Sequence, residues 1–323
     1  MGAAAVLSIS GLRTEFRTRR GPVAAVDGLD LELPAGETFG LVGESGCGKS
    51  VTALSILRLL PRPAGRVAAG SIRFEGEDLL ALPEAAMRRI RGNRISMIFQ
   101  EPMTSLNPVL PVGFQIEEVL RKHRGLSARE ARAEVGGLLA RVGMPDPQSR
   151  LDDYPHQLSG GMRQRAMIAI ALACRPALMI ADEPTTALDV TIQAQILELI
   201  SRLQAEFGMS VLLITHDLGV VAETCREAAV MYAGRIVERA AVARLYARPA
   251  HPYTVGLFRS LPRAVGRGGK LTPIPGTVPH PAELPPGCAF QERCFQRHAA
   301  CREDPPWAEV ATGHFARCWK PLG

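Results

Sequence analysis

Residues 43–50 read Gly43-Glu44-Ser45-Gly46-Cys47-Gly48-Lys49-Ser50 and fit the phosphate-binding pattern G-x-x-x-x-G-K-[ST]. The stretch lies between an apolar run at residues 38–42 and a helical pattern that begins at Ser50. Glycines let the backbone turn tightly, so that successive N–H groups converge on phosphate oxygens at the start of a helix. A Gly-rich turn with no ligand is the structural alternative. The pattern predicts a loop that binds a nucleoside triphosphate, with Lys49 at the β- and γ-phosphates and the Ser50 hydroxyl on Mg²⁺.

The composition is that of an ordinary globular protein: 323 residues, 46% of them hydrophobic and 22% charged, with a net charge of +6. The longest apolar stretch, residues 166–181, is broken by Arg175 and Pro176, so we expect no membrane span. The first residues lack the basic start of a secretory signal, and we expect a cytosolic chain. The basic charge permits binding to nucleic acid, anionic lipid or nucleotides, but its spread over many segments favours a solvated surface.

Three predicted buried strands end in polar side chains. Residues 95–99 are followed by Gln100, residues 177–181 by Asp182 and Glu183, and residues 211–215 by His216. Open α/β sheets bind their ligands at the carboxyl ends of parallel strands, so we expect these side chains at one catalytic edge. Two adjacent acids there, in a chain with a phosphate loop, indicate Mg²⁺ binding and a general base.

Other segments predict the surroundings of this edge. Alternating residues 6–16 and 24–32 predict antiparallel strands before the loop, and Phe16 in the first of them either stacks on a base or packs in the core. Residues 112–151 have a helical pattern and predict an inserted helical subdomain. Ser159 is a predicted N-cap followed by two glycines, and residues 190–207 predict an amphipathic helix.

Four of the seven cysteines lie in the last 36 residues, separated by gaps of five, six and sixteen residues. Four thiolates suffice for Zn²⁺ or for an iron–sulfur cluster, but the paired C-x₂-C spacing of zinc sites is absent. Disulfides are disfavoured in a reducing cytosol. The spacing therefore favours iron–sulfur, with zinc and free thiols as alternatives, for the set Cys288, Cys294, Cys301 and Cys318. Cys47, Cys174 and Cys225 are isolated and are interpreted as packing residues.

The order of these motifs resembles an ATP-binding cassette (ABC) ATPase over about residues 6–240. The resemblance rests on the phosphate loop, Gln100, the Leu158-Ser159-Gly160-Gly161-Met162 signature, Asp182-Glu183, Asp189 and His216. Residues 251–254, 274–279 and 287–288 resemble the C-terminal region of dipeptide, oligopeptide and nickel importers. The resemblance implies a phosphate-loop (RecA-like) α/β core with an antiparallel β subdomain and a helical subdomain at about residues 101–160. The expected domains are an ATPase at residues 1–260 and a cysteine-rich extension at residues 261–323.

The resemblance also implies roles for individual residues. Glu183 would polarise the attacking water, Gln100 and His216 would sense the γ-phosphate, Asp189 would link the two sites, and Phe16 would stack on adenine. Mg²⁺ would be held by Ser50, Asp182 and Gln100. The ATP contacts would come from the phosphate loop and from the signature of a second cassette: Gly43, Ser45, Gly46, Cys47, Gly48, Lys49, Ser50 and Val51, then Ser159, Gly160 and Gly161. The four tail cysteines would hold a [4Fe–4S] cluster, as they can in that subfamily.

The expected partners are two membrane permease subunits and a sister ABC ATPase, with a solute-binding protein acting indirectly from outside the cell. The chain would therefore sit at the cytoplasmic face of the cell membrane. The transported solute stays open among dipeptides, longer peptides, nickel chelates and related solutes, with peptides as the main expectation. A nucleic-acid-acting ABC ATPase is the rival class, and it is disfavoured because the chain has one cassette, no coiled-coil insertion and a tail of importer type.

Overall fold

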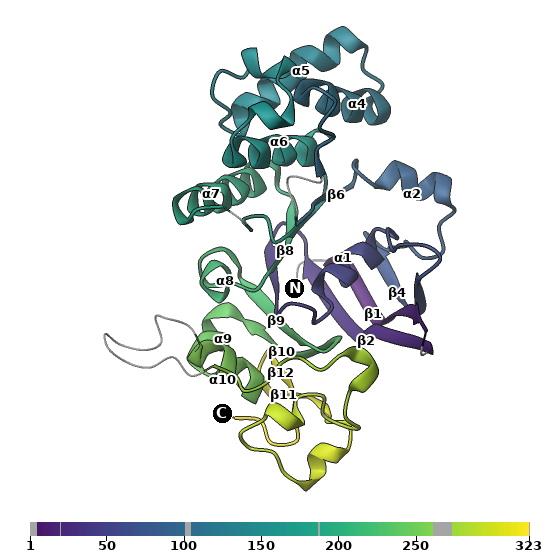
Figure 1. Ribbon diagram of the computed structural model, residues 1–323, viewed down its shortest axis with the longest axis vertical. Coiled ribbons are helices and arrows are strands. Elements are labelled where there is room, and N and C mark those ends of the chain that lie inside the picture. Colours follow the sequence, from purple (N-terminus) through teal and green to yellow (C-terminus); the bar gives the residue numbers. More distant parts are fainter. Residues whose placement is uncertain (1–4, 20, 101–104, 187, 261–272, 323) are drawn as a thin grey trace. The chain divides into compact units, whose positions relative to one another are not determined.

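The computed structural model describes residues 5–19, 21–100, 105–186, 188–260 and 273–322. The chain forms two compact units (Figure 1). The first is built mainly from residues 81–213, and the second from residues 7–32, 39–80 and 214–323.

The first unit combines three strands with a group of helices. Its strands follow the order β8-β7-β6, and β6 and β7 pair in parallel with Ile95 opposite Leu178. The strands are β6 (Ile95–Ile98), β7 (Leu178–Asp182) and β8 (Ser210–Thr215). The helices are α2 (Glu84–Ile90), α4 (Val112–Arg124), α5 (Ala128–Arg141), α6 (Gly160–Leu172) and α7 (Val190–Phe207), with short 3₁₀ turns η1 (Ser149–Asp152) and η2 (Pro155–Gln157).

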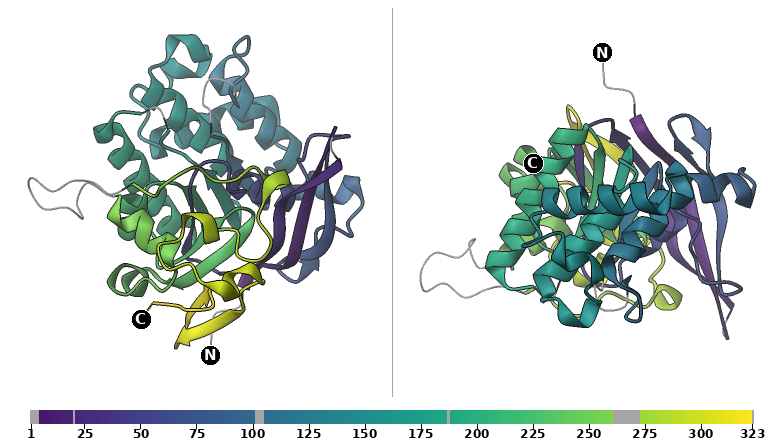
Figure 2. Two further views of the ribbon diagram at one scale, coloured as in Figure 1. Left: turned by 60° about the horizontal axis from the view of Figure 1, so that its bottom comes forward. Right: turned by 90° about the horizontal axis from the view of Figure 1, so that it is seen from above.

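Burial explains why these strands read as continuous apolar runs in the sequence. Every residue of β7 and of β8 is buried, which is typical of parallel strands that are covered on both faces. Helices α4 and α5 pack against each other and against α6 (Figures 1 and 2). Helix α5 begins at a capping box in which Ser127 and Glu130 satisfy each other's backbone N–H groups. The helical pattern predicted for residues 112–151 is confirmed by α4, α5 and η1.

The second unit contains two sheets. The first has the order β2-β1-β4-β5, with β1 and β4 antiparallel, and the second has the order β11-β12-β10-β9-β3. The strands are β1 (Ala5–Thr18), β2 (Gly21–Pro34), β3 (Thr38–Val42), β4 (Gly65–Phe74), β5 (Glu77–Asp78), β9 (Glu227–Tyr232), β10 (Arg235–Ala241), β11 (Trp307–Ala311) and β12 (His314–Arg317). The helices are α1 (Lys49–Ile56), α8 (Leu218–Thr224), α9 (Val242–Ala247) and α10 (Pro252–Arg259), with 3₁₀ turns η4 (Pro281–Glu283), η5 (Gln291–Arg293) and η6 (Ala299–Arg302).

The C-terminal extension joins the core of this second unit. Strand β12 pairs with β10, and β11 pairs with β12 to form a hairpin (yellow in Figures 1 and 2). Tyr232, Tyr253 and Phe290 form one aromatic cluster, with ring centroids 4.7 to 5.3 Å apart. The extension is therefore packed into the second unit by buried aromatic side chains.

Strands β9 to β12 are not anticipated in the sequence analysis. Strand β11 exposes its first three residues, and the alternation of buried and half-buried residues in β12 spans only four residues, which is too short to mark a strand in the sequence. The predicted strands at residues 6–16, 24–32, 95–99, 177–181 and 211–215 are confirmed within one or two residues at most boundaries. The amphipathic helix at residues 190–207 is confirmed.

Candidate nucleotide-binding site

The phosphate loop connects strand β3 to helix α1. Gly46 and Gly48 have φ angles of 81° and 109°, a region that favours glycine. Helix α1 begins at Lys49 with neither a side-chain cap nor an acidic residue in its first turn. Its first N–H groups and its dipole therefore favour an anion at this end, as predicted for a phosphate site.

Lys49 is held inside the loop. Its side chain is buried, and Nζ donates to the carbonyl oxygens of Gly43 at 2.8 Å and Glu44 at 3.0 Å. The Cys47 Sγ atom lies 3.8 Å from the same Nζ. Burial raises the pKa of the Cys47 thiol, so it packs as a neutral group. Within the loop, Ser45 and Gly46 are exposed and accessible to a ligand, while Ser50 and Val51 are half-buried at the start of α1.

Gly43 lies so close to another backbone segment that it has no room for a side chain. A Cβ atom at this position would lie 2.2 Å from the Met231 carbonyl oxygen, whereas a Cβ atom at Gly46 would meet nothing within 4 Å. We predict that Gly43→Ala destabilises the nucleotide-free chain by about 3 kcal/mol because backbone must shift. Gly46→Ala should lower the free energy of unfolding by only about 1 kcal/mol, because its sole cost is the left-handed backbone conformation. Urea unfolding of both variants tests this, and equal losses would contradict the clash.

Acidic side chains gather at the carboxyl end of β7. Asp182 is the last residue of the strand and is buried, and Glu183 follows it with a φ angle of 47°. Gln100 Nε2 donates to Glu183 Oε2 at 3.1 Å, and Thr186 Oγ1 donates to the same oxygen at 2.9 Å. The predicted meeting of Gln100 with the acids is confirmed. The left-handed backbone at a non-glycine residue is a strain that is common at functional sites.

Thr186 is the member of this group that the sequence analysis missed. A hydroxyl three residues after a strand-terminal carboxylate, inside a tight turn, is the signal that could have found it.

The signature residues begin helix α6. Ser159 Oγ accepts a hydrogen bond from the Met162 N–H, which confirms the predicted N-cap, and Gly160 is the first helical residue. Ser159 and Gly160 are exposed, and Gly161 is half-buried. Asp189 caps helix α7 by accepting from the Ile192 N–H at 2.9 Å.

Two predicted site residues lie in the second unit with the phosphate loop. His216 is exposed directly after β8, and the next residue, Asp217, caps helix α8. Phe16 is half-buried in β1, opposite Gly65 of β4, and a Cβ atom at Gly65 would lie 2.9 Å from the Phe16 ring. The ring thus packs over Gly65 and keeps part of its surface accessible. Gln100, Asp182, Glu183, Asp189 and the signature lie in the first unit.

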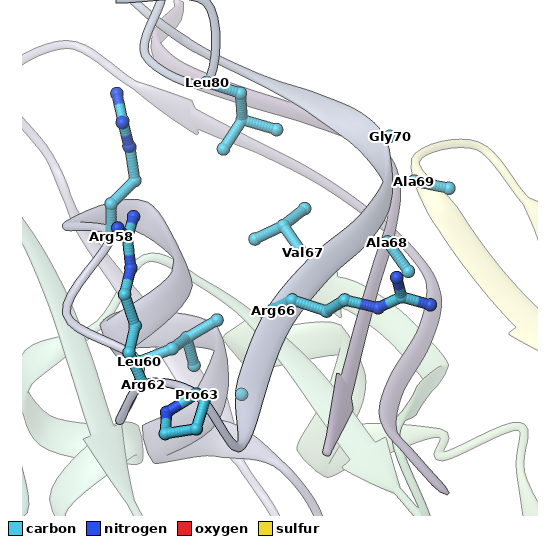
Figure 3. Close-up of a pocket in the computed structure, with 11 residues that line it drawn as sticks. Arg58, Leu60, Arg62, Pro63, Arg66, Val67, Ala68, Ala69, Gly70 and Leu80 are labelled. Carbon is cyan, nitrogen blue, oxygen red and sulfur yellow. The ribbon is translucent and has the colours of Figure 1, made fainter. Parts of the chain in front are cut away.

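A further cavity lies away from these residues. It has a volume of about 540 Å³ and lies beside strand β4, where Arg58, Arg62 and Arg66 line it (Figure 3). Arg66 forms an ion pair with Glu15 at 3.1 Å, and Arg58 donates to the Leu79 carbonyl oxygen. None of the predicted site residues lines this cavity.

The four tail cysteines line one small cavity together with His251, Phe290 and Trp319. Its volume of about 10 Å³ is close to that of one water molecule. Burial raises the pKa of Cys288 to about 11 and also raises the pKa values of Cys294 and Cys318. In the part of the chain that the structure describes, no three His, Cys, Asp or Glu side chains are placed to hold a single metal ion.

Comparisons with known proteins match both parts of the chain. A family model described as ABC transporter matches residues 26–186, and one described as oligopeptide/dipeptide transporter, C-terminal region, matches residues 237–301. A putative peptide import ATP-binding protein of Brucella ovis is 57% identical over 98% of both chains. The dipeptide transport ATP-binding protein DppD of Bacillus subtilis is 52% identical over 97% of this chain and 94% of its own.

Solved structures agree with the sequence matches. The dimeric ATP-binding cassette MJ0796 bound to ADP and Pi aligns with a TM-score of 0.65 at 26% identity, over 73% of this chain and 98% of that chain. The chain belongs to the ABC transporter family and is an ATP-hydrolysing cassette of that family. The resemblance found in the motifs is thereby confirmed. No helix among the described residues is long and apolar enough to cross a membrane.

Proposed function

We propose that this chain is the ATP-hydrolysing subunit of an importer of dipeptides or oligopeptides. The observation that carries the proposal is the pairing of a cassette with a C-terminal region that matches oligopeptide and dipeptide transporters. Relatives that match along nearly the whole chain have names that refer to peptide import or dipeptide transport.

Within this function, the residues of each unit have separate tasks. The phosphate loop with Lys49 binds the triphosphate, and Phe16 offers its accessible ring face to adenine. Glu183 accepts a proton from the attacking water, and its orientation is set by the hydrogen bonds from Gln100 and Thr186. Ser50, Asp182 and Gln100 present the oxygen ligands that Mg²⁺ prefers, and the ion would neutralise charge on the phosphates.

The exposed signature supports pairing with a second cassette. Ser159 and Gly160 are accessible at the start of α6, where another chain's nucleotide can approach their N–H groups. We propose a sister ATPase as this partner, with His216 and Asp189 at the closed interface. A site completed only by closure makes hydrolysis depend on closure, because phosphoryl transfer relies on positioning and charge stabilisation.

Transport further requires membrane subunits. We propose two permeases as partners, with a solute-binding protein delivering peptide from outside, so that this chain sits at the cytoplasmic face of the membrane. Expression of the tagged chain in its own cells should recover permeases and a second cassette from detergent-solubilised membranes. Uptake of a radiolabelled dipeptide should be lost on deletion and restored by the wild-type chain. Restoration of nickel uptake alone, or salt-dependent retention on DNA without permeases, would overturn the proposal.

We also propose that residues 261–323 are an extension that holds a [4Fe–4S] cluster. Four thiols around one cavity are the donor set of such a cluster, in which each cysteine binds its own iron atom. Ligands of a cluster are therefore spaced around it and need not converge on one point. Loading would deprotonate Cys288, Cys294, Cys301 and Cys318 and would widen the small cavity.

Anaerobic purification tests the cluster. We predict about four iron atoms per chain and a brown colour from thiolate-to-iron absorption, both lost in Cys294→Ser. Cys225→Ser is the matched control, because Cys225 lies outside the cavity and packs beside helix α8. Zinc in place of iron, or iron retained in Cys294→Ser, would contradict this assignment.

A further inference from the structure

Glu44, the second residue of the phosphate loop, is held at three points. Its N–H donates to the Tyr253 hydroxyl at 2.9 Å, and its carbonyl oxygen accepts from Lys49 Nζ at 3.0 Å. Its carboxylate accepts two hydrogen bonds from Arg293, at 2.7 and 2.9 Å. Glu44 therefore connects the phosphate-binding lysine to two residues that lie more than 200 positions along the chain.

The Arg293 side chain is buried and is held in position by several contacts. Its side chain is only 5% exposed, and its guanidinium lies over the rings of Tyr232 and Phe290. Its other N–H groups donate to the carbonyl oxygens of Pro275 at 2.8 Å and Gly276 at 3.3 Å and to the Tyr232 hydroxyl at 3.5 Å. A parallel pair of hydrogen bonds to a carboxylate is the strongest arrangement open to arginine and fixes the orientation of both groups.

Arg293 also belongs to the cysteine-rich part of the chain. It is the last residue of η5 and directly precedes Cys294, and its N–H donates to the Phe290 carbonyl oxygen. Phe290 lines the cysteine cavity on the other side of this turn. Phe290 and Cys294, which flank this turn, line the cysteine cavity, and Arg293 at its end contacts Glu44 of the phosphate loop.

We infer that the C-terminal extension completes the nucleotide site, with Arg293 as a positioning residue that acts through Glu44. Two physical effects support a higher affinity for nucleotide. The ion pair neutralises a carboxylate that would otherwise repel the phosphates from within their own loop. The anchored loop also loses less conformational freedom when ligand binds, so less of the binding energy is used to order it.

This inference depends only on nucleotide binding, and it is independent of the transported solute and of the metal. Its test is the affinity of the full-length chain for ADP, measured by isothermal titration. Arg293→Ala should weaken ADP binding about tenfold, because a charged hydrogen-bonded pair is lost and the carboxylate is left unpaired. In a Glu44→Ala background the same change should matter less than about twofold, since residues that act as one unit are not additive.

Two further variants complete the experiment. Arg297→Ala removes an exposed arginine from the same tail and should leave ADP affinity unchanged. Arg293→Lys keeps the charge but not the paired geometry, so it should be intermediate, and it carries the test if Arg293→Ala does not fold. Thermal unfolding checks the fold of each variant. A folded Arg293→Ala with wild-type ADP affinity, or an equal tenfold loss in the Glu44→Ala background, would overturn the inference.

Discussion

Replacing Glu183 by glutamine should leave ATP binding intact and reduce hydrolysis by at least about 100-fold, because a general base contributes that much or more. Glutamine keeps the shape of the side chain and can still accept the hydrogen bonds from Gln100 and Thr186. It cannot take a proton from water. The substitution therefore removes the chemistry and preserves the arrangement around it.

Phosphate release under saturating ATP measures the loss, and a fluorescent nucleotide measures binding. Glu198→Gln is the matched control, since Glu198 is an exposed carboxylate on helix α7. It should hydrolyse ATP at the wild-type rate. Wild-type turnover in Glu183→Gln would remove Glu183 from the proposed role and would direct attention to His216 or Asp182.

Replacing Glu238 by alanine should lower the free energy of unfolding by about 3 to 5 kcal/mol, as expected when one partner of a buried polar cluster is removed. Glu238 lies fully buried in β10 and accepts from the N–H groups of Ala250 and His251 at 2.6 and 2.9 Å. Its Oε1 atom lies 2.7 Å from His314 Nε2 in β12. One carboxylate thus binds the start of helix α10 and the C-terminal hairpin.

The neighbouring His251 adds no positive charge to this cluster near pH 7. Burial lowers the pKa of His251 to about 4, so the ring is neutral near pH 7 and its Nδ1 accepts from the Tyr253 N–H. Alanine at position 238 leaves several buried donors without an acceptor. Urea unfolding and protease release of the tail measure the result, with the exposed Glu292→Ala as control. A loss below about 1 kcal/mol would contradict the role of Glu238 as an anchor.

The sequence predicted the parts of the site that are local in the chain. Local motifs depend only on neighbouring residues and can therefore be recognised in the sequence. This holds for the phosphate loop, the N-cap at Ser159 and the acids after β7. The meeting of Gln100 with Glu183 was also predicted, because parallel strands bring their carboxyl ends to one edge. The roles of these residues in hydrolysis stay predictions.

Contacts between distant residues could not be predicted in the same way. Arg293 and Glu44 are 249 positions apart, and each looks like an ordinary surface charge in its own segment. Glu238 lies in an Arg-Ile-Val-Glu-Arg run, where nothing local marks it as buried. The cysteines are an intermediate case, since their number indicated a common site but not the size of the cavity that they line.

The hairpin at the end of the chain also protects the sheet. Strand β12 occupies the side of β10 that would otherwise offer unpaired N–H and C=O groups to any passing strand. The new outer strand, β11, is only five residues long and carries Glu309 on its exposed stretch, while Trp307 stacks on Phe315 and lies beneath Arg317. Short length and charge discourage further strand addition. The C-terminal segment that contacts the phosphate loop thus also protects the edge of the sheet against aggregation by strand addition.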